Sequence, residues 1–440
     1  MSILAEFRIV HRSFFGRTKI RLQLAGSAAH GAIRGRVGAV IGCTLVCLSL
    51  WIPTAAFGQQ VLDLRGVLAA AESGNLELRA ARQQRALAIA GLTTARQLPN
   101  PTVSFTAARD VPHEGVSLDV PVELGGKRSK RIAIAKEEQQ STEIDIAVLA
   151  LQVRRRAREA FYRALSAREQ TAQAKTALDL SSHTRDLVEQ RFEAGDVAQL
   201  EVLQADVELA KSSADYETTE QTQKAADVTL AALLNRNLEE TLSLQGQLDG
   251  IPPTPALQEV TDRAMQSNGD LLKSAQDLRT EERRLALANA QKIPNLDLSA
   301  GSDFNSPPDF RVGAKGGISV ALPLFNHGQG DIALSTARLE LLRLTLASQR
   351  NIVSAQVAAA FFDYVAKSHQ VQRYHDSVLP QSIRLEQMAE DSYQSGKTNV
   401  LTLLDAQRRL NDVRVAYVGA LFAAQSSFAA LEEAVGAPLD

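Results

Sequence analysis

Two kinds of hydrophobic periodicity alternate along this chain, and each kind occurs twice. Apolar residues alternate with polar ones over residues 102–107 and 116–122, and again over 296–304 and 311–322. Such alternation predicts β-strands, and a polar turn separates the two strands of each pair. Elsewhere, apolar and small residues recur at spacings of three and four, which predicts helices. The pattern therefore indicates two β-hairpins set among long helices.

The helical segments contain few helix breakers. Residues 127–194 have neither Gly nor Pro, and residues 331–395 have only Pro380. At about 1.5 Å per residue, each segment predicts a helix roughly 100 Å long. In the first segment a narrow seam of small and apolar residues is formed by Ile146, Leu149, Val153, Ala157, Ala160 and Ala164. A narrow seam on so long a helix predicts packing against partner helices.

Each long helix is followed by a glycine and then by a second helical segment. Gly195 and Gly396 stand where the end of a helix favours a left-handed residue, and helical periodicity resumes over 197–235 and 398–435. Each half of the chain therefore predicts a long helical hairpin, with its tip near residue 195 or 396.

The two halves also resemble each other in sequence. Residues 75–126 recur about 195 positions later as residues 270–328. The matching pairs are LPNPTVSF (98–105) with IPNLDLS (293–299), VSLDVPV (116–122) with ISVALPL (318–324), and FEAG (192–195) with YQSG (393–396). A long fixed period indicates one architectural unit used twice. We expect a first repeat over 59–250 with a β-hairpin over 102–122, and a second over 251–440 with a β-hairpin over 296–325.

Residues 1–58 have the features of an export signal. They carry seven Lys or Arg and one Glu, and an apolar stretch over 37–52 precedes small residues near position 58. We expect a signal peptide cleaved near Gly58. The sequence VIGC, ending at Cys43, resembles a lipobox and leaves lipidation as an alternative. A retained anchor is disfavoured, because the stretch is shorter than the roughly 20 apolar residues that span a bilayer.

Composition excludes several classes of function for the rest of the chain. Both cysteines, Cys43 and Cys47, lie in the expected signal, so no disulfide or thiolate metal site is predicted beyond it. The remaining 41 basic and 49 acidic residues form no basic face for nucleic acid. The histidines are scattered, and no nucleophile, phosphate-binding loop or cofactor motif stands out. We therefore expect no enzyme activity, no cofactor and no resident metal.

The predicted hairpins have consequences for assembly. Isolated hairpins expose unpaired edges and are marginally stable, and four strands cannot close a barrel within one chain. A closed barrel is one of only two structures that can cross lipid, and several identical chains can close one together. The sequence therefore predicts a ring of protomers with a β end in a membrane and an α-helical tube about 100 Å long.

On these features the chain resembles the TolC-type outer membrane efflux proteins over about residues 61–438. The segment VPVELGGKR (120–128) is most similar to the cobalt-zinc-cadmium branch of that family. The resemblance implies a homotrimer whose twelve-stranded outer-membrane β-barrel, four strands per protomer, continues into a long periplasmic α-helical barrel. It further implies a passive exit duct for divalent heavy-metal cations. Its implied partners are a periplasmic adaptor and an inner-membrane pump of the resistance-nodulation-division class.

The resemblance also implies functional residues at the helical tips, where the family closes its periplasmic entrance. Tyr393 and Gly396 match the tip pattern, and Asp405 matches an acidic residue of the constriction. The chain departs from the pattern at two positions, Thr398 and Thr402, so the usual clasp of Tyr, Arg and Asp is incomplete. In the first repeat the equivalents of Thr402 and Asp405 are Glu201 and Gln204. A ring built from Glu201 and Asp405 would attract cations, while acidic residues near helix N-termini are also favourable for the helix dipole alone.

The segment after the first hairpin is expected to be mainly structural. Glu123, Gly125, Gly126, Lys127 and Arg128 predict a strand-to-helix junction, in which the glycines supply the bend and the basic residues lie at the rim of the membrane.

Other functions remain open on the sequence. A duct of the same fold could serve drug or organic-solvent efflux, because the entrance does not reveal what the pump selects. A periplasmic coiled-coil adaptor would also show helical hairpins, but it would lack two amphipathic β-hairpins placed symmetrically. A soluble enzyme is disfavoured by the absence of catalytic motifs.

Overall fold

The structure is a computed structural model that describes residues 62–238, 242–306 and 308–439. The expected signal peptide and both cysteines lie outside the described residues. The helices and strands described belong to the unit that follows Gly58.

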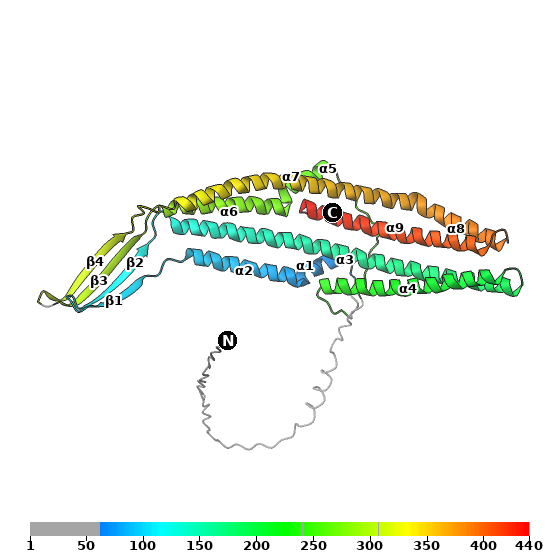
Figure 1. The fold of residues 1–440 in the computed structure, drawn as a ribbon, viewed down its shortest axis with the longest axis horizontal. Helices are drawn as coiled ribbons and strands as arrows, with labels where there is room; N and C mark the ends of the chain where they lie inside the picture. The colour runs from blue at the N-terminus through cyan, green and yellow to red at the C-terminus, as the bar shows by residue number, and fades with distance from the viewer. Residues whose placement is uncertain (1–61, 239–241, 307, 440) are drawn as a thin grey trace, which may run out of the picture. The chain divides into compact units, whose positions relative to one another are not determined.

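The described residues of the first half form four helices and two strands, whose labels are those of Figure 1. They are α1 (Leu64–Gly74), α2 (Leu76–Arg96), β1 (Thr102–Ala107), β2 (Glu114–Val122), α3 (Lys127–Glu193) and α4 (Gln199–Leu233). Asp63 and Asn75 cap α1 and α2, since their side chains accept hydrogen bonds from Gly66 N and Leu78 N. α3 is one uninterrupted helix of 67 residues, in agreement with the lack of Gly and Pro.

The second half repeats this order with one difference. Its elements are α5 (Leu257–Ser267), α6 (Gly269–Gln291), β3 (Leu296–Ser306), β4 (Phe310–Val320), α7 (Gln329–Arg373), the π-helical turn η1 (Tyr374–Val378), α8 (Leu379–Gln394) and α9 (Val400–Val435). Asn268 caps α6 as Asn75 caps α2. The internal duplication is thus visible in the structure.

The predicted long helix over 331–395 is present over residues 329–394, but it contains a π-helical turn. The chain forms α7 and α8 with η1 between them, and Pro380 lies at the start of α8. Proline has no N–H, and its ring crowds the carbonyl group four residues earlier, so a regular α-helical turn is disfavoured before it. A π turn widens the helix at that point. The equivalent stretch of α3 has no proline and stays regular.

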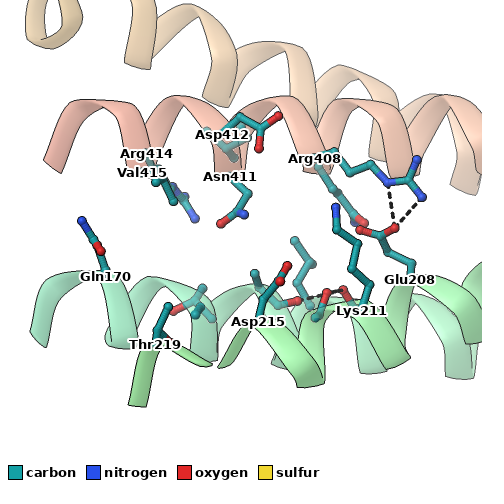
Figure 2. A pocket seen from close by; sticks show the side chains of 18 of the residues that line it. Gln170, Glu208, Lys211, Asp215, Thr219, Arg408, Asn411, Asp412, Arg414 and Val415 are labelled. Carbon is teal, nitrogen blue, oxygen red and sulfur yellow. Dashed lines mark hydrogen bonds and ion pairs between the residues drawn. The ribbon is translucent and has the colours of Figure 1, made fainter. Parts of the chain in front are cut away.

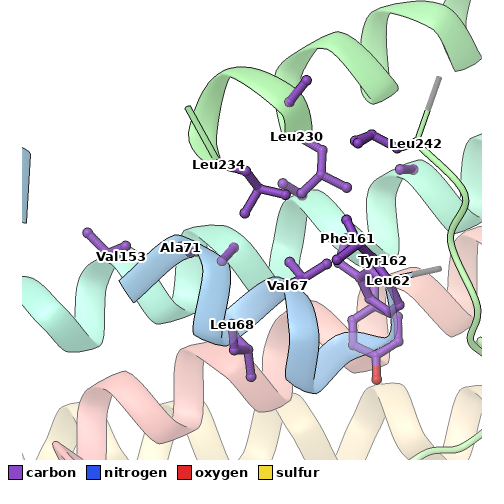
Figure 3. Close-up of a cluster of buried hydrophobic side chains, with 14 of the residues drawn as sticks. Leu62, Val67, Leu68, Ala71, Val153, Phe161, Tyr162, Leu230, Leu234 and Leu242 are labelled. Carbon is purple, nitrogen blue, oxygen red and sulfur yellow. The ribbon is translucent and has the colours of Figure 1, made fainter. Parts of the chain in front are cut away.

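α3 is the central helix of the fold. It packs against α2, α4, α6 and α9. The largest buried cluster forms where α1, α3 and α4 meet, and it includes Val67, Leu68, Val153, Phe161 and Leu230 (Figure 3). Five of the six predicted seam residues of α3 are buried, and Leu149 is partly buried. Their small size lets the neighbouring helices approach closely.

The four strands form a single antiparallel sheet in the order β1-β2-β3-β4. The two hairpins are joined through β2 and β3, in a register that pairs Glu114 with Phe304 and Val122 with Leu296. β2 begins two residues before the predicted start, and β4 ends at Val320, two residues before the predicted end. At that end Leu324 N donates to the Leu322 carbonyl oxygen at 2.9 Å, so the chain turns and leaves the ladder. Within one chain, β1 and β4 are the edges of this sheet.

Candidate functional site

The two helical tips share one backbone geometry. Gly195 and Gly396 have φ values of 82° and 70°, a left-handed conformation that favours glycine. Asp196 N donates to Arg191 O at 2.8 Å, and Lys397 N donates to Ser392 O at 2.9 Å, which closes each α-helix in the same way. A small apolar cluster then holds the two tips together, and it contains Val188, Ala205, Ala389, Tyr393, Val400, Leu403, Leu404 and Ala406.

Arg191 connects the first tip to the second. Its guanidinium carbon lies 4.8 Å from the centroid of the Tyr393 ring, and its Nη1 donates to the Tyr393 carbonyl oxygen at 3.1 Å. Tyr393 is 1% exposed. Burial raises the pKa of the Tyr393 hydroxyl, the charge of Arg191 opposes this rise, and the charge of Glu201 adds to it. The tyrosine therefore stays neutral, and the arginine provides a cation–π contact.

Sequence reasoning missed Arg191. The family clasp takes its arginine from a position that is Thr398 here, whereas the structure takes a guanidinium from the other repeat. Arg191 lies directly before the FEAG segment that matches YQSG. That adjacency was the only signal that could have pointed to it.

Three oxygen atoms at the tips are buried without a hydrogen bond of normal geometry to any described residue. They are the Tyr393 hydroxyl, the Thr398 hydroxyl and Glu201 Oε2. Burying a polar atom without a hydrogen-bond partner costs free energy, so such atoms are uncommon in folded proteins. Among the predicted site residues, Tyr393 and Glu201 lie close enough for the charge of Glu201 to act on the tyrosine.

The two predicted acidic residues of the entrance, Asp405 and Glu201, lie in different surroundings. Asp405 is exposed and accepts a hydrogen bond from Arg409 Nε at 2.8 Å, four residues along the same helix. Across the described residues, no hydrogen bond or ion pair links Asp405 to Glu201. Thr402 belongs to the start of α9, where its backbone N–H donates to the Asn399 side chain, and Gln204 is half-buried.

A second contact between the two hairpins lies between two and three turns from the starts of α4 and α9. Arg408 Nε of α9 donates to Glu208 Oε2 of α4 at 2.7 Å, and a second nitrogen of the guanidinium also contacts this carboxylate. Glu208 is 8% exposed. The pair borders a groove of about 240 Å³ between α3, α4 and α9, which Asp215, Asn411 and Arg414 also line (Figure 2).

The strand-to-helix junction after β2 is stabilised by hydrogen bonds and an ion pair of its charged residues. Arg131 forms a bidentate ion pair with Glu123, which lowers the pKa of that carboxyl group. Lys127 is buried and donates to Asn295 Oδ1 at 2.6 Å, and Arg128 donates to the carbonyl oxygen of Arg96 at the end of α2. These contacts connect the junction to the end of α2 in the first repeat and to the segment before β3 in the second.

The glycines make the bend of this junction possible. Gly125 and Gly126 have φ values of 71° and 68°. A Cβ on Gly125 would lie 2.9 Å from Ile293 Cδ1, so the close approach to the second repeat also requires glycine.

The sheet has one apolar and one polar face. By register, one face carries Val103, Phe105, Val116, Leu118, Val120, Leu298, Ala300, Phe304, Val312, Ala314, Ile318 and Val320. Many of these side chains are exposed, for example Val103 at 71% and Ile318 at 73%. The opposite face carries Ser, Thr, Gly, Asp and Lys residues, including the ion pair of Lys315 with Asp303 at 2.6 Å. A large exposed apolar face with a polar reverse is the pattern of a membrane-spanning barrel strand.

The described part of the chain contains no metal-binding cluster and one helix that is long and apolar enough to span a bilayer. Within residues 62–238, 242–306 and 308–439, no group of three or more His, Cys, Asp or Glu is arranged to hold a metal ion. Among the described helices, α9 alone is long and apolar enough to span a bilayer, with a mean hydropathy of 1.2 in its best window. Because 56% of that window is buried and α9 packs against α3 and α7, we assign α9 to the helical core.

Comparison with known proteins is consistent with this geometry. Residues 67–236 and 260–437 match the model of the family described as outer membrane efflux protein, one stretch in each repeat. The cobalt-zinc-cadmium resistance protein CzcC of Cupriavidus metallidurans is 24% identical over 363 residues, which cover 82% of this chain and 86% of that protein. The pyoverdine export outer membrane protein OpmQ of Pseudomonas aeruginosa is 25% identical over 414 residues, covering 87% and 85%.

Solved structures share the fold. The structure of CusC has a TM-score of 0.71 at 17% identity, covering 85% of this chain and 92% of that one. The outer membrane protein VceC of Vibrio cholerae has a TM-score of 0.70 at 16% identity, covering 86% and 97%. The predicted family resemblance is thereby confirmed at the level of fold.

Proposed function

The chain belongs to the outer membrane efflux protein family, and from this premise we propose that three copies form an exit duct that passively conducts divalent heavy-metal cations. Members of this family are efflux channels of the outer membrane that extend into the periplasm. The observation that carries the proposal is the sheet, because it has an exposed apolar face, a polar face and two unpaired edges.

Closure of the sheet requires other copies of the chain. β1 and β4 are edge strands of a four-stranded sheet, and an edge cannot remain unpaired in lipid. Pairing β4 of one copy with β1 of the next, three times, gives a closed barrel of twelve strands. The apolar face then contacts lipid and the polar face lines the lumen. A homotrimer therefore satisfies the backbone of every strand.

Exposed apolar side chains on the helices also favour contacts with neighbouring copies of the chain. Leu87 on α2 and Leu341 and Leu344 on α7 are 73%, 63% and 71% exposed in the single chain. α3 and α6 lie between these two helices, since α2 packs on α3, α3 on α6 and α6 on α7. α2 and α7 are thus the outer helices of one protomer, and their exposed leucines fit contacts between copies in an α-helical barrel.

The tips serve as the entrance in this proposal. Arg191 and Tyr393 hold the two hairpins of one protomer together, Glu208 and Arg408 add a second contact, and Asp405 projects into solvent beside them. Separation of the hairpins opens the duct. Substrate is delivered by a periplasmic adaptor and an inner-membrane pump of the resistance-nodulation-division class, because the duct has no energy source of its own.

The substrate class rests on similarity to the cobalt-zinc-cadmium resistance protein, supported by the acidic residues Glu201 and Asp405 near the entrance. A ring of carboxylates attracts cations and repels anions. The similarity to a pyoverdine export protein favours a second candidate, the export of organic compounds, through a duct of the same construction.

A deletion strain separates the two candidates. Tolerance to Zn²⁺, Cd²⁺, Co²⁺, Ni²⁺ and Cu⁺ is measured beside tolerance to dyes, antibiotics and siderophores, with and without the intact gene. Selective sensitivity to metals, restored by the gene, is the expected result. Sensitivity confined to organic compounds would retain the duct and contradict the metal assignment.

A further inference from the structure

The polar face of the sheet carries a lysine whose side chain crosses the neighbouring strand. Lys315 lies on β4 directly opposite Gly301 of β3. Its ammonium group donates to Asp303 Oδ1 of β3 at 2.6 Å. The same group also reaches β2, because a Cβ on Gly115 would lie only 3.3 Å from Lys315 Nζ. The side chain thus lies along the polar face, across β3, instead of standing away from the sheet.

Two glycines leave room for this side chain. A Cβ on Gly301 would lie 3.2 Å from Lys315 Cε, and a Cβ on Gly115 would lie 2.6 Å from Asp303 Oδ1. Glycine weakens the interior of a strand, and it often occurs there where another group approaches the backbone closely. Gly115 and Gly301, called the glycine bed here, therefore form the surface on which Lys315 lies.

The two glycines differ in what else requires them. A Cβ on Gly301 would also clash with the Val116 carbonyl oxygen, so this glycine is needed for the pairing of β2 with β3. The atoms nearest to a Cβ on Gly115 are all ends of side chains, namely Asp303 Oδ1, Thr106 Oγ1 and Lys315 Nζ. A larger residue at position 115 therefore displaces the ion pair and leaves the backbone ladder intact.

The polar face carries more acidic than basic side chains. Asp119 and Asp297 lie on it towards the helices, and in the described part of the chain neither forms an ion pair. Arg311 lies at the hairpin end of β4. Lys315 lies between these ends, and its charge is balanced by Asp303. Because rings of acidic side chains favour cations in channels, an unbalanced ammonium group on this face would oppose their passage.

We propose that Gly115 and Gly301 are positioning residues of the duct, which hold Lys315 against the wall and paired with Asp303, so that its charge does not oppose cations in the lumen. This inference rests on the proposed duct, in which the polar face lines the lumen. Each copy of the chain contributes one such lysine. Separation of the pair would therefore place three ammonium groups in the path of the cations.

The reactivity of Lys315 towards an amine reagent tests its position directly. The intact protein in detergent is treated briefly with sulfo-N-hydroxysuccinimide acetate, and peptide mass spectrometry compares acetylation of Lys315 with that of Lys292, which is exposed. G115V crowds the ion pair, and D303N removes its carboxylate. G317A is the matched control, because its Cβ meets Ser299 Oγ on the same face and no atom of Lys315 within 4 Å.

We expect acetylation of Lys315 to be faster in G115V than in the unchanged protein, to approach the rate in D303N, and to be unchanged in G317A. These rates would show that the glycine bed keeps the lysine paired. Equal rates in G115V and the unchanged protein would refute the positioning role of the glycine bed.

Ion selectivity tests the consequence for passage. Reversal potentials are measured across planar bilayers in a gradient of KCl, with all proteins carrying R191A to remove the contact between the tips. G115V should shift the reversal potential from the potassium value towards the chloride value. G115V/K315Q should match K315Q, because the valine acts through Lys315.

Two results would contradict the proposal at different points. If G115V exposes Lys315 to the reagent but leaves the reversal potential unchanged, the lysine does not affect cation passage and the inference is refuted while the duct stands. If no protein conducts ions, the unchanged one included, the proposed duct is refuted, and the role of the glycine bed in passage is refuted with it.

Discussion

The guanidinium of Arg191, at the end of α3, lies 4.8 Å from the centre of the Tyr393 ring, at the end of α8. The same side chain donates to the Tyr393 carbonyl oxygen at 3.1 Å. The two residues are 202 positions apart and belong to different repeats. Their contact therefore joins the two hairpin tips, and its loss should favour separation of the tips.

R191A should shift the entrance toward the open state. A buried cation–π contact contributes about 1–2 kcal/mol, which corresponds to roughly a five- to thirty-fold change in the ratio of closed to open forms. The measurement is sensitivity of cells to a large antibiotic that does not normally cross the outer membrane. R409A is the matched control, because Arg409 is exposed and forms its ion pair with Asp405 of the same helix. Equal sensitivity of the two variants would contradict a latch at Arg191.

The two faces of β4 should respond differently to charge. I318R places a charge on the face assigned to lipid and should cost about 2–4 kcal/mol at mid-membrane depth. S319R places the same charge on the polar face, one residue along the strand, and should be tolerated. The amount of folded protein in the outer membrane measures both. Equal loss with the two variants would contradict the assignment of faces.

Much of this fold follows from local sequence patterns. Period-two alternation located the strands to within two residues at their ends, because alternating side chains must face opposite sides of a sheet. The lack of Gly and Pro located α3, and Pro380 lies two residues after the π turn of the second long helix. The widened turn that results could not be predicted, since the sequence does not say how a helix accommodates its proline.

The contacts at the tips could not be read from local patterns. Sequence reasoning correctly noted that Thr398 cannot supply the arginine of the family clasp. It did not find Arg191, because a contact across 202 residues depends on how the two repeats pack. For the same reason the pairing of Asp405 with Arg409, and the half-buried position of Glu201, became visible only in three dimensions.

The buried ion pair of Arg158 with Glu432 should be important for stability. The two side chains are 4% and 9% exposed, and Arg158 also lies 5.3 Å from the centre of the Phe428 ring. E432Q removes the carboxylate of a buried ion pair and should cost about 3–5 kcal/mol. The double variant R158M/E432L removes both charges and should recover most of the loss. Melting temperatures in detergent measure both, and equal melting of the single and double variants would contradict the account.

Acid should weaken the junction at Glu123. Its pKa is lowered below the ordinary value of 4.5, first by the hydrogen bond from Arg131. The contribution of the pair is thus fully present above the ordinary pKa and is lost as the pH falls through the lowered one. The melting temperature of E123Q should lie below that of the unchanged protein at neutral pH, and the gap should close in acid. E143Q, at a more exposed pair with Arg85, should show a smaller gap. A gap at Glu123 that is independent of pH would contradict the assignment.

In the proposed assembly, copies of this chain close a duct together. The mass of the intact complex, measured by native mass spectrometry after gentle extraction from the outer membrane, tests it most directly. We expect a complex of three chains, held together until the detergent solution is heated. A complex of one or two chains would leave the edges of β1 and β4 unpaired and would contradict the duct.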